Sequence, residues 1–204
     1  MLTATLFALA VATAPTNECV TCHEDVVKAF AFVSHPAECA ACHTVKKEHL
    51  ESADKTAVTR VPKSETCASC HRAQRAAFNR TFAHRQGREP MACIDCHDIH
   101  GNRHAERLST ARTSAVCVDC HTDLAGPRVF EHRAQQVNGC LGCHESHGST
   151  NARLLKRRDI ASLCLECHAN APRFHDITQT KFRACVTCHV AVHGSNRDAN
   201  LLDE

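Results

Sequence analysis

The chain has 204 residues, with no Trp, no Tyr and only 4% aromatic residues, so it would struggle to build a large hydrophobic core from side chains alone. Lys and Arg number 24 against 22 Asp and Glu, and no basic run is interleaved with aromatic residues, which argues against a nucleic-acid partner. The chain nevertheless holds 16 Cys and 17 His, which indicates that something other than protein fills its interior.

The N-terminal segment is apolar and then rich in small residues, and its Ala10-Val11-Ala12 sequence fits an A-x-A cleavage site. We expect residues 1–14 to be a signal peptide or an N-terminal tail, although the segment has no Lys or Arg. The apolar run is too short to cross a bilayer, which takes about 20 residues. No other stretch is long enough, so the sequence predicts an exported protein without a transmembrane helix.

Every Cys belongs to one motif, Cys-x-x-Cys-His, and eight copies account for all 16 Cys. Two thiols three residues apart can add to the two vinyl groups of one haem, and the next His then lies under the iron as proximal ligand. The motif is the attachment signature of c-type haem, so the sequence predicts eight haems. The copies are Cys19, Cys22 and His23; Cys39, Cys42 and His43; Cys67, Cys70 and His71; Cys93, Cys96 and His97; Cys117, Cys120 and His121; Cys140, Cys143 and His144; Cys164, Cys167 and His168; and Cys185, Cys188 and His189.

Three other uses of Cys fit this pattern less well. Disulfides would explain an even number of Cys but not a His after every second one. Zinc sites use Cys-x-x-Cys pairs, but their ligands come in fours and need no fixed Cys-His dipeptide. A thioredoxin-like motif occurs once, near a βαβ pattern that is absent here.

The motifs alternate between two types. After the first type, a Phe-containing segment leads to a further His, and after the second type the further His follows sooner. First-type motifs begin at positions 19, 67, 117 and 164, a period of about 48 residues that is typical of repeat architectures. We therefore expect one octahaem domain over residues 15–204, made of four di-haem units at about 19–60, 61–110, 111–158 and 159–204.

Regular secondary structure should be modest. We expect short helices at residues 24–33, 72–81 and 159–167, separated by irregular backbone in which Pro residues act as breakers. No segment has a convincing strand pattern. The predicted fold class is mostly irregular with short α-helices and little or no β-sheet: an elongated haem wire held together by thioether and iron–histidine bonds.

Each iron also needs a sixth ligand. Removing the eight motif His from 17 leaves nine, and the repeat assigns two of them to each unit. The ninth, His104, aligns with Asn151 and Arg197 and is expected at the surface, while Met91 is the only Met besides Met1 and makes methionine ligation improbable. The sequence does not pair distal His with haems, because each can serve its own unit or a neighbour. The expected distal ligands are His35, His49, His84, His100, His132, His147, His175 and His193.

An iron with two His ligands has no open position for substrate, which argues against an enzyme. The chain also lacks the Cys-x-x-Cys-Lys motif and the Tyr that some multihaem enzymes use. We therefore expect electron transfer through low-potential bis-His haems, with no catalytic residues.

The motifs resemble those of the DmsE/MtrA-type multihaem cytochromes over residues 18–202. The likeness rests on four segments, at residues 42–49, 97–101, 144–148 and 185–196, which carry the Cys-His…His and Cys-His-x-x-His-Gly elements. In that family the His of these elements are distal haem ligands. Family members usually carry ten haems, so this chain is more similar in haem count to octahaem periplasmic subunits of porin–cytochrome conduits.

The resemblance implies a slender haem wire in the periplasm, inserted into an outer-membrane β-barrel porin. Its implied partners are periplasmic cytochrome donors, that porin, and an outer-surface multihaem cytochrome, in a route for extracellular electron transfer. Two alternatives stay open. One is a soluble periplasmic shuttle or electron donor to a reductase, and the other is a subunit of an extracellular cytochrome filament.

Overall fold

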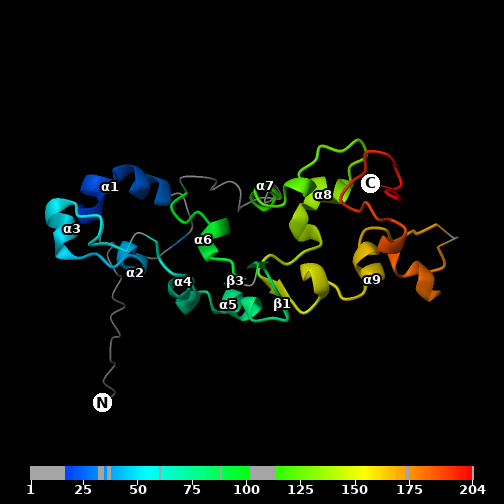
Figure 1. Cartoon of the computed structure of the whole chain (residues 1–204), viewed down its shortest axis with the longest axis horizontal. Helices are drawn as coiled ribbons and strands as arrows, with labels where there is room; N and C mark the ends of the chain where they lie inside the picture. The colour runs from blue at the N-terminus through cyan, green and yellow to red at the C-terminus, as the bar shows by residue number, and fades with distance from the viewer. Residues whose placement is uncertain are drawn as a thin grey trace, which may run out of the picture.

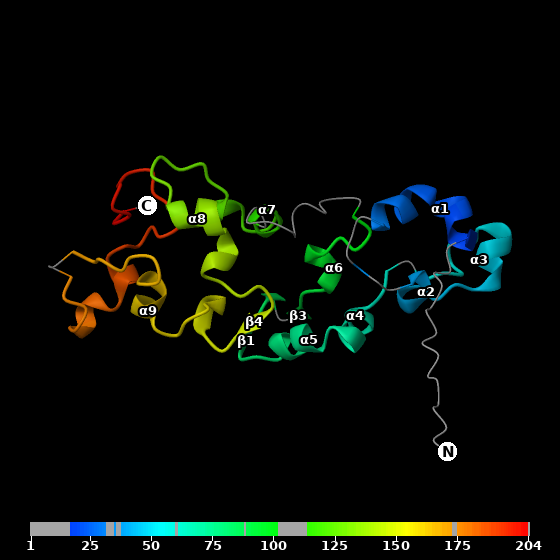
Figure 2. The same cartoon turned by 180° about the vertical axis from the view of Figure 1, so that it is seen from behind.

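The chain forms an elongated body that advances steadily from one end to the other. A computed structural model describes residues 17–31, 35, 38–59, 61–87, 89–101, 114–172 and 175–203. The first helices lie at one end of the long axis and the C-terminal segments lie at the other (Figure 1), and the reverse view shows the same progression (Figure 2). The predicted signal segment and His104 lie outside the described residues.

The helices are short, and most of them coincide with a haem-attachment motif. Short helices cannot persist alone in water, so each depends on contacts made by its neighbours. Besides α1, each α-helix has between four and seven residues. The α-helices are α1 Asn17–Phe30, α2 Cys39–Cys42, α3 Lys47–Ser52, α4 Ser64–Cys70, α5 Arg72–Phe78, α6 Cys93–Cys96, α7 Ser114–Val118, α8 Arg133–Asn138 and α9 Ile160–Cys164, and the 3₁₀ turns are η3 Thr122–Leu124, η4 Cys140–Gly142, η5 Ala152–Leu154, η6 Thr180–Phe182 and η7 Cys185–Thr187.

The three expected helices exist, with different bounds. Helix α1 begins earlier than predicted, at Asn17, and runs through the first motif with a kink at His23. Helix α5 ends at Phe78 because the chain then extends to pair with a distant strand. Helix α9 covers only residues 160–164 and begins where the Asp159 carboxylate accepts a hydrogen bond of 2.9 Å from the Ser162 amide.

β-structure is confined, among the described residues, to strands of two residues. β1 (Phe82–Ala83) pairs antiparallel with β4 (Gly148–Ser149), and β2 (Arg85–Gln86) pairs antiparallel with β3 (Glu89–Pro90). The β1–β4 pair joins the second repeat unit to the third. The fold is therefore mostly irregular with short helices and minimal sheet, which confirms the predicted fold class. Isolated bridges link Val45 to Val58, Phe130 to Ser195 and His144 to Leu155.

Little of the polypeptide is buried by other polypeptide. Its accessible surface is 15950 Å², whereas a folded single domain of this size exposes about 9,400 Å². No helix in the described part of the chain is both long and apolar enough to cross a membrane. As the composition predicted, protein side chains alone do not form a substantial core. The buried side chains of the described residues are Ala57, Ala161, Ala191, Ser149 and Ser195.

One glycine is required by close approach of the chain in the β1–β4 pair. A Cβ atom on Gly148 would lie 2.1 Å from the carbonyl oxygen of Ala77, which is backbone and cannot move aside cheaply. We expect Gly148→Ala to lower the free energy of unfolding of the haem-loaded protein by about 3 kcal/mol. Thermal unfolding followed by circular dichroism measures this change.

Gly87→Ala is the matched control. A Cβ there meets no atom within 4 Å, so this substitution costs only its positive φ, about 1 kcal/mol. Equal losses of stability in the two variants would contradict the close-approach explanation.

Candidate haem-binding sites

Each attachment motif folds into one helical turn that closes on its own His. In seven of the eight motifs, the backbone amide of the motif His donates to the carbonyl of the first motif Cys, at 2.9 to 3.0 Å. The eighth motif, Cys19 to His23, lies within α1. This turn brings both thiols and the imidazole together, which is the arrangement that covalent haem attachment requires. The seven amides belong to His43, His71, His97, His121, His144, His168 and His189.

The sixteen predicted ligand His form eight imidazole pairs. Each motif His faces one of the predicted distal His, and each of the sixteen occurs in one such pair. Ring centroids are 5.8 to 6.3 Å apart and ring planes differ by 9 to 31°. The pairs are His23–His49, His43–His100, His71–His35, His97–His147, His121–His84, His144–His193, His168–His132 and His189–His175.

This separation fits an iron bound between two imidazoles. A metal–imidazole bond is about 2 Å long and the ligating nitrogen lies about 1.1 Å from its ring centre, so coaxial ligands place ring centres about 6.2 Å apart. The observed pairs scatter around that value. Within the described ranges, no three His, Cys, Asp or Glu side chains gather into a group that could hold a metal ion. The spacing of the facing rings fits bis-His haem, with one pair of His for each iron.

Six of the eight pairs join neighbouring repeat units. The further His after a first-type motif reaches forward to the next unit, as His84 does to His121. The further His after a second-type motif reaches back to the previous unit, as His147 does to His97. At the two ends of the described chain the pairs close within one unit, as His23–His49 and His175–His189. The pairing that the sequence left open is thus an exchange between neighbours.

Backbone carbonyls orient several of these rings through Nδ1. A bond from Nδ1–H to a carbonyl fixes the tautomer and leaves the Nε2 lone pair free for iron. The acceptor carbonyls lie in loops between five and sixty residues away in sequence. The bonds run from His43 to Thr59 at 2.6 Å, His49 to Asp54 at 2.9 Å, His132 to Val192 at 2.8 Å, His144 to Arg153 at 2.8 Å and His189 to Asn200 at 2.7 Å.

Burial favours the neutral imidazole at five of the paired His. It lowers the pKa of His97 and His147, and the nearby imidazoles lower the pKa of His97 further. Burial is also the main cause of the lowered pKa of His84, His100 and His193. A neutral ring has the lone pair that iron binding needs.

Thiols of neighbouring motifs, from the second motif to the eighth, lie close enough to influence one another electrostatically. Burial raises the pKa of the Cys67 thiol, and the thiols of Cys93 and Cys42, from the motifs on either side, raise it further. The same neighbour relation holds between Cys96 and Cys120. It continues to the C-terminal end through Cys117 with Cys140, Cys143 with Cys167 and Cys164 with Cys185. The attachment points thus follow one another along the long axis.

Comparison with known proteins identifies the family. Residues 84–126 and 132–173 match the family described as a doubled CXXCH motif, and residues 18–101 match the family of cytochrome c554 and c-prime. The chain is 32% identical over 200 residues to the protein named multiheme cytochrome MtrA from Shewanella baltica (strain OS185). This chain is a multihaem c-type cytochrome that is similar to MtrA. The match covers 90% of this chain and 59% of MtrA, so the cytochrome spans about three fifths of that relative.

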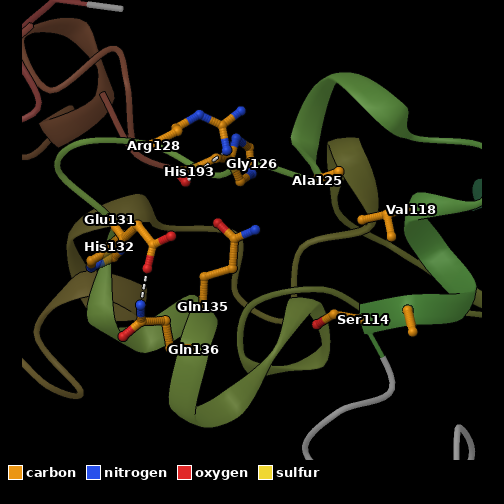
Figure 3. Close-up of a pocket in the computed structure, with 11 residues that line it drawn as sticks. Ser114, Val118, Ala125, Gly126, Arg128, Glu131, His132, Gln135, Gln136 and His193 are labelled. Carbon is orange, nitrogen blue, oxygen red and sulfur yellow. Dashed lines mark hydrogen bonds between the residues drawn. The ribbon is translucent and has the colours of Figure 1, made fainter. Parts of the chain in front are cut away.

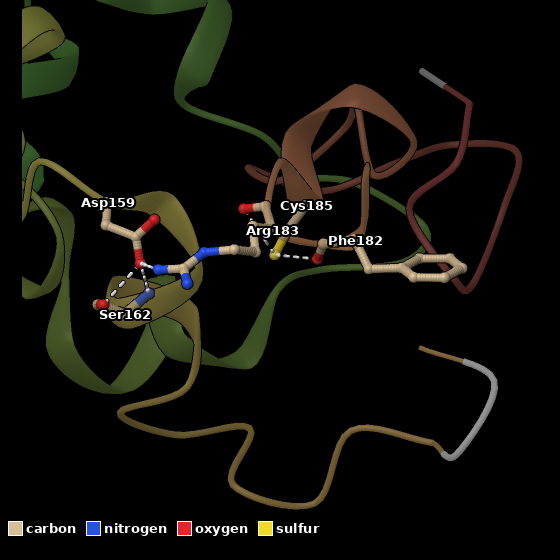
Figure 4. A network of polar contacts seen from close by, with 5 residues as sticks. All are labelled: Asp159, Ser162, Phe182, Arg183 and Cys185. Atoms are coloured by element: carbon tan, nitrogen blue, oxygen red, sulfur yellow. Dashed lines mark hydrogen bonds and ion pairs between the residues drawn. The ribbon is translucent and has the colours of Figure 1, made fainter. Parts of the chain in front are cut away.

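Within a unit of this cytochrome, a polar contact holds the two motifs together. The Ser64 hydroxyl accepts from the Cys93 amide at 3.4 Å, and the Ser114 hydroxyl accepts from the Cys140 amide at 3.2 Å. Both Ser lie three residues before a first-type motif. In the last unit that position is Ala161, and an ion pair substitutes: Arg183 donates to Asp159 at 3.0 Å (Figure 4).

A cavity of 210 Å³ lies in the third unit of the cytochrome, between α7 and α8. Its lining includes His132 and His193, which belong to two different imidazole pairs, and Figure 3 shows Arg128 beside His193. The Gln135 Oε1 oxygen, which also lines it, is buried without a hydrogen-bond partner among the described residues. The cavity adjoins two of the imidazole pairs and so belongs to the predicted haem-binding region.

Phe side chains cover several distal His, a feature that the sequence analysis missed. Phe30 lies 6.0 Å from His35 and 6.2 Å from His100 between ring centres. Phe78 covers His147 at 5.5 Å. The Phe-containing segments after the first-type motifs were the available signal, but it was incomplete, because Phe78 covers His147 of the next unit and Phe182 follows His175 in the sequence. Phe182, in η6, likewise lies edge-on to His175 at 5.7 Å.

Proposed function

We propose that this cytochrome binds eight c-type haems and conducts electrons along them. The observation that carries the proposal is that sixteen His form eight pairs at one spacing, with none used twice. The motif Cys would form the thioether bonds, the motif His would be proximal ligands and their partners distal ligands. Each haem supplies one-electron chemistry between ferric and ferrous iron.

Ligation by two His supports conduction over catalysis. A catalytic metal site keeps a position open for substrate, whereas two imidazoles fill both axial positions. The chain's residues then have three tasks: they attach the porphyrin edge, orient the axial imidazoles, and bring neighbouring attachment points close together. The last task is visible in the thiol contacts between Cys67 and Cys93 and between Cys164 and Cys185.

The first test counts haems and their ligands. Intact mass and haem quantification should give eight haems per chain, all low-spin, with no carbon monoxide binding to the reduced protein. His100→Ala should create one carbon monoxide-reactive haem, while His104→Ala should leave the wild-type spectrum, because the pairs use every His except His104. A wild-type protein with fewer haems, or with a reactive one, would refute the proposal.

The second test asks whether distal ligands are exchanged between units. Because His147 faces His97, His147→Ala should free the haem attached at Cys93 and Cys96, and not the one attached in its own unit. The readout is carbon monoxide uptake by the reduced protein. In a variant with both Cys93 and Cys96 replaced by Ala, adding His147→Ala should create no reactive haem.

The control repeats this experiment after removal of the haem that is attached in the unit of His147 itself. With Cys140 and Cys143 replaced by Ala, His147→Ala should still create one reactive haem. The opposite pattern would show that His147 serves its own unit, contrary to the geometry.

We further propose that the cytochrome acts in the periplasm as the wire of an outer-membrane conduit, with residues 1–14 as its signal segment and residues 15–204 as the haem domain in four di-haem units. Its elongated shape and its similarity to MtrA support this role. The proposed partners are a β-barrel porin, an outer-surface multihaem cytochrome and periplasmic cytochrome donors.

Purification from the native outer membrane tests this role. We expect a β-barrel protein to co-purify with the cytochrome at one-to-one stoichiometry, and the pair to carry electrons into sealed liposomes. A soluble monomer without a barrel partner would instead favour the periplasmic shuttle, and an end-to-end polymer would favour the filament.

A further inference from the structure

Two copies of one short motif meet two copies of another across the unit boundaries. Arg-x-Phe-x-His occurs at residues 80–84 and 128–132. His-Gly-Ser occurs at residues 147–149 and 193–195. Each Arg-x-Phe-x-His segment lies against the His-Gly-Ser segment of the following unit, and we call each meeting a joint. The two joints carry the distal His that reach back to the preceding unit.

The first joint connects the second and third units. Arg80 donates from Nη1 to the carbonyl of Gly148 at 3.1 Å. Beside this contact Phe82 pairs with Ser149 in the β1–β4 ladder. The backbone amide of His84 also points to the carbonyl of His147, at 3.4 Å. The guanidinium thus holds the Gly148 carbonyl, one residue after the distal His147, while the His147 carbonyl accepts from the His84 amide.

The second joint connects the third and fourth units through the equivalent Arg, which contacts the carbonyl one residue earlier in the His-Gly-Ser segment. Arg128 donates from Nη1 to the carbonyl of His193 at 3.3 Å and from Nη2 to the carbonyl of Asp123 at 2.7 Å. Phe130 and Ser195 exchange two backbone hydrogen bonds of 2.8 Å each. One guanidinium therefore ties a loop of the third unit to the backbone of the distal His of the fourth.

The joints are among the few places where this chain is fully buried. Ser149 is 3% exposed and Ser195 is 1% exposed, although almost all other side chains of the described residues reach solvent. The Ser195 hydroxyl accepts from the amides of Arg197 and Asp198, and a Cβ on Gly194 would lie 2.6 Å from the Arg128 side chain. Arg128 thus closes over a tightly fitted segment, and in the first joint the Ala77 carbonyl approaches Gly148 in a similarly close way.

We propose that Arg80 and Arg128 are positioning residues that hold the distal His147 and His193 on the irons of the preceding unit's second motifs. The inference rests on the proposed haem ligation. A charged donor to a carbonyl makes a stronger hydrogen bond than a neutral one. Each Arg belongs to the same unit as the iron that the distal His would bind. The contact therefore fixes the imidazole of that His relative to the iron. Without it, the backbone of the distal His can move away and the iron can lose a ligand.

The test uses the haem-loaded full chain with Arg80→Gln, Arg128→Gln and both together. The readouts are haem number, low-spin signal by electron paramagnetic resonance, and carbon monoxide uptake after reduction. We expect haem number to stay at the wild-type value. Carbon monoxide uptake should rise from none to one haem per chain in each single variant and to two in the double variant. Arg80→Lys should restore most of the low-spin signal, because it keeps a charged donor.

Arg75→Gln is the matched control, because Arg75 lies exposed on α5, a few residues before Arg80. Combining Arg80→Gln with His147→Ala should add no reactive haem beyond His147→Ala alone, since both act on one iron. Uptake in Arg80→Gln no greater than in Arg75→Gln would overturn the inference. If Arg80→Gln lowers the haem number, the carbon monoxide uptake of Arg128→Gln is compared with that of Arg75→Gln instead, and an uptake no greater than in Arg75→Gln would overturn the inference.

Failure of the proposed function gives a different result. If the wild-type protein already has a carbon monoxide-reactive haem or fewer than eight haems, the ligation itself is wrong. If the wild-type protein is fully low-spin and the Arg variants equal Arg75→Gln, only the positioning role is wrong.

Discussion

The facing of two imidazoles from neighbouring units is the interaction on which this structure depends. His97 and His147 lie in different repeats, yet their ring centres are 6.0 Å apart. The same relation recurs along the chain, from His43 with His100 to His144 with His193. Under the proposed ligation, each such pair would fix the distance between two units more strictly than side-chain packing does, because an iron–nitrogen bond tolerates little change of length.

This constraint explains why so little conventional packing is needed. Short helices such as α2 and α6 have no stability of their own, and the polypeptide exposes far more surface than a domain of its size normally does. Two of the few buried side chains, Ser149 and Ser195, lie where units meet. Backbone carbonyls also orient several of the paired His rings. Repeat proteins commonly derive stability from contacts between neighbouring units, and in this cytochrome metal ligands would share that role.

Sequence alone could predict the parts that are local. A Cys-x-x-Cys-His motif holds two thiols and an imidazole within five residues, so c-type haem attachment follows from spacing alone, whereas the family was inferred from a resemblance of the Cys-His-x-x-His-Gly elements. The ring pairing could not be predicted, because whether His35 meets His23 or His71 depends on the path of the chain between them. The contact of Arg80 could not be predicted either, because its acceptor is a backbone carbonyl, which any residue could supply. Helix α5 is shorter than its sequence pattern suggests because Phe82 is drawn into a long-range strand pair.

The alternation of forward and backward ligands has a consequence for how the protein matures. In a chain that emerges N-terminus first, His84 is already present when Cys117 and Cys120 appear. The haem attached at these two Cys can therefore acquire both axial ligands at once. The haem at Cys93 and Cys96 must wait until His147 has emerged. Under the proposed ligation, the two classes of haem therefore differ in how long each iron stays five-coordinate and open to stray ligands during synthesis.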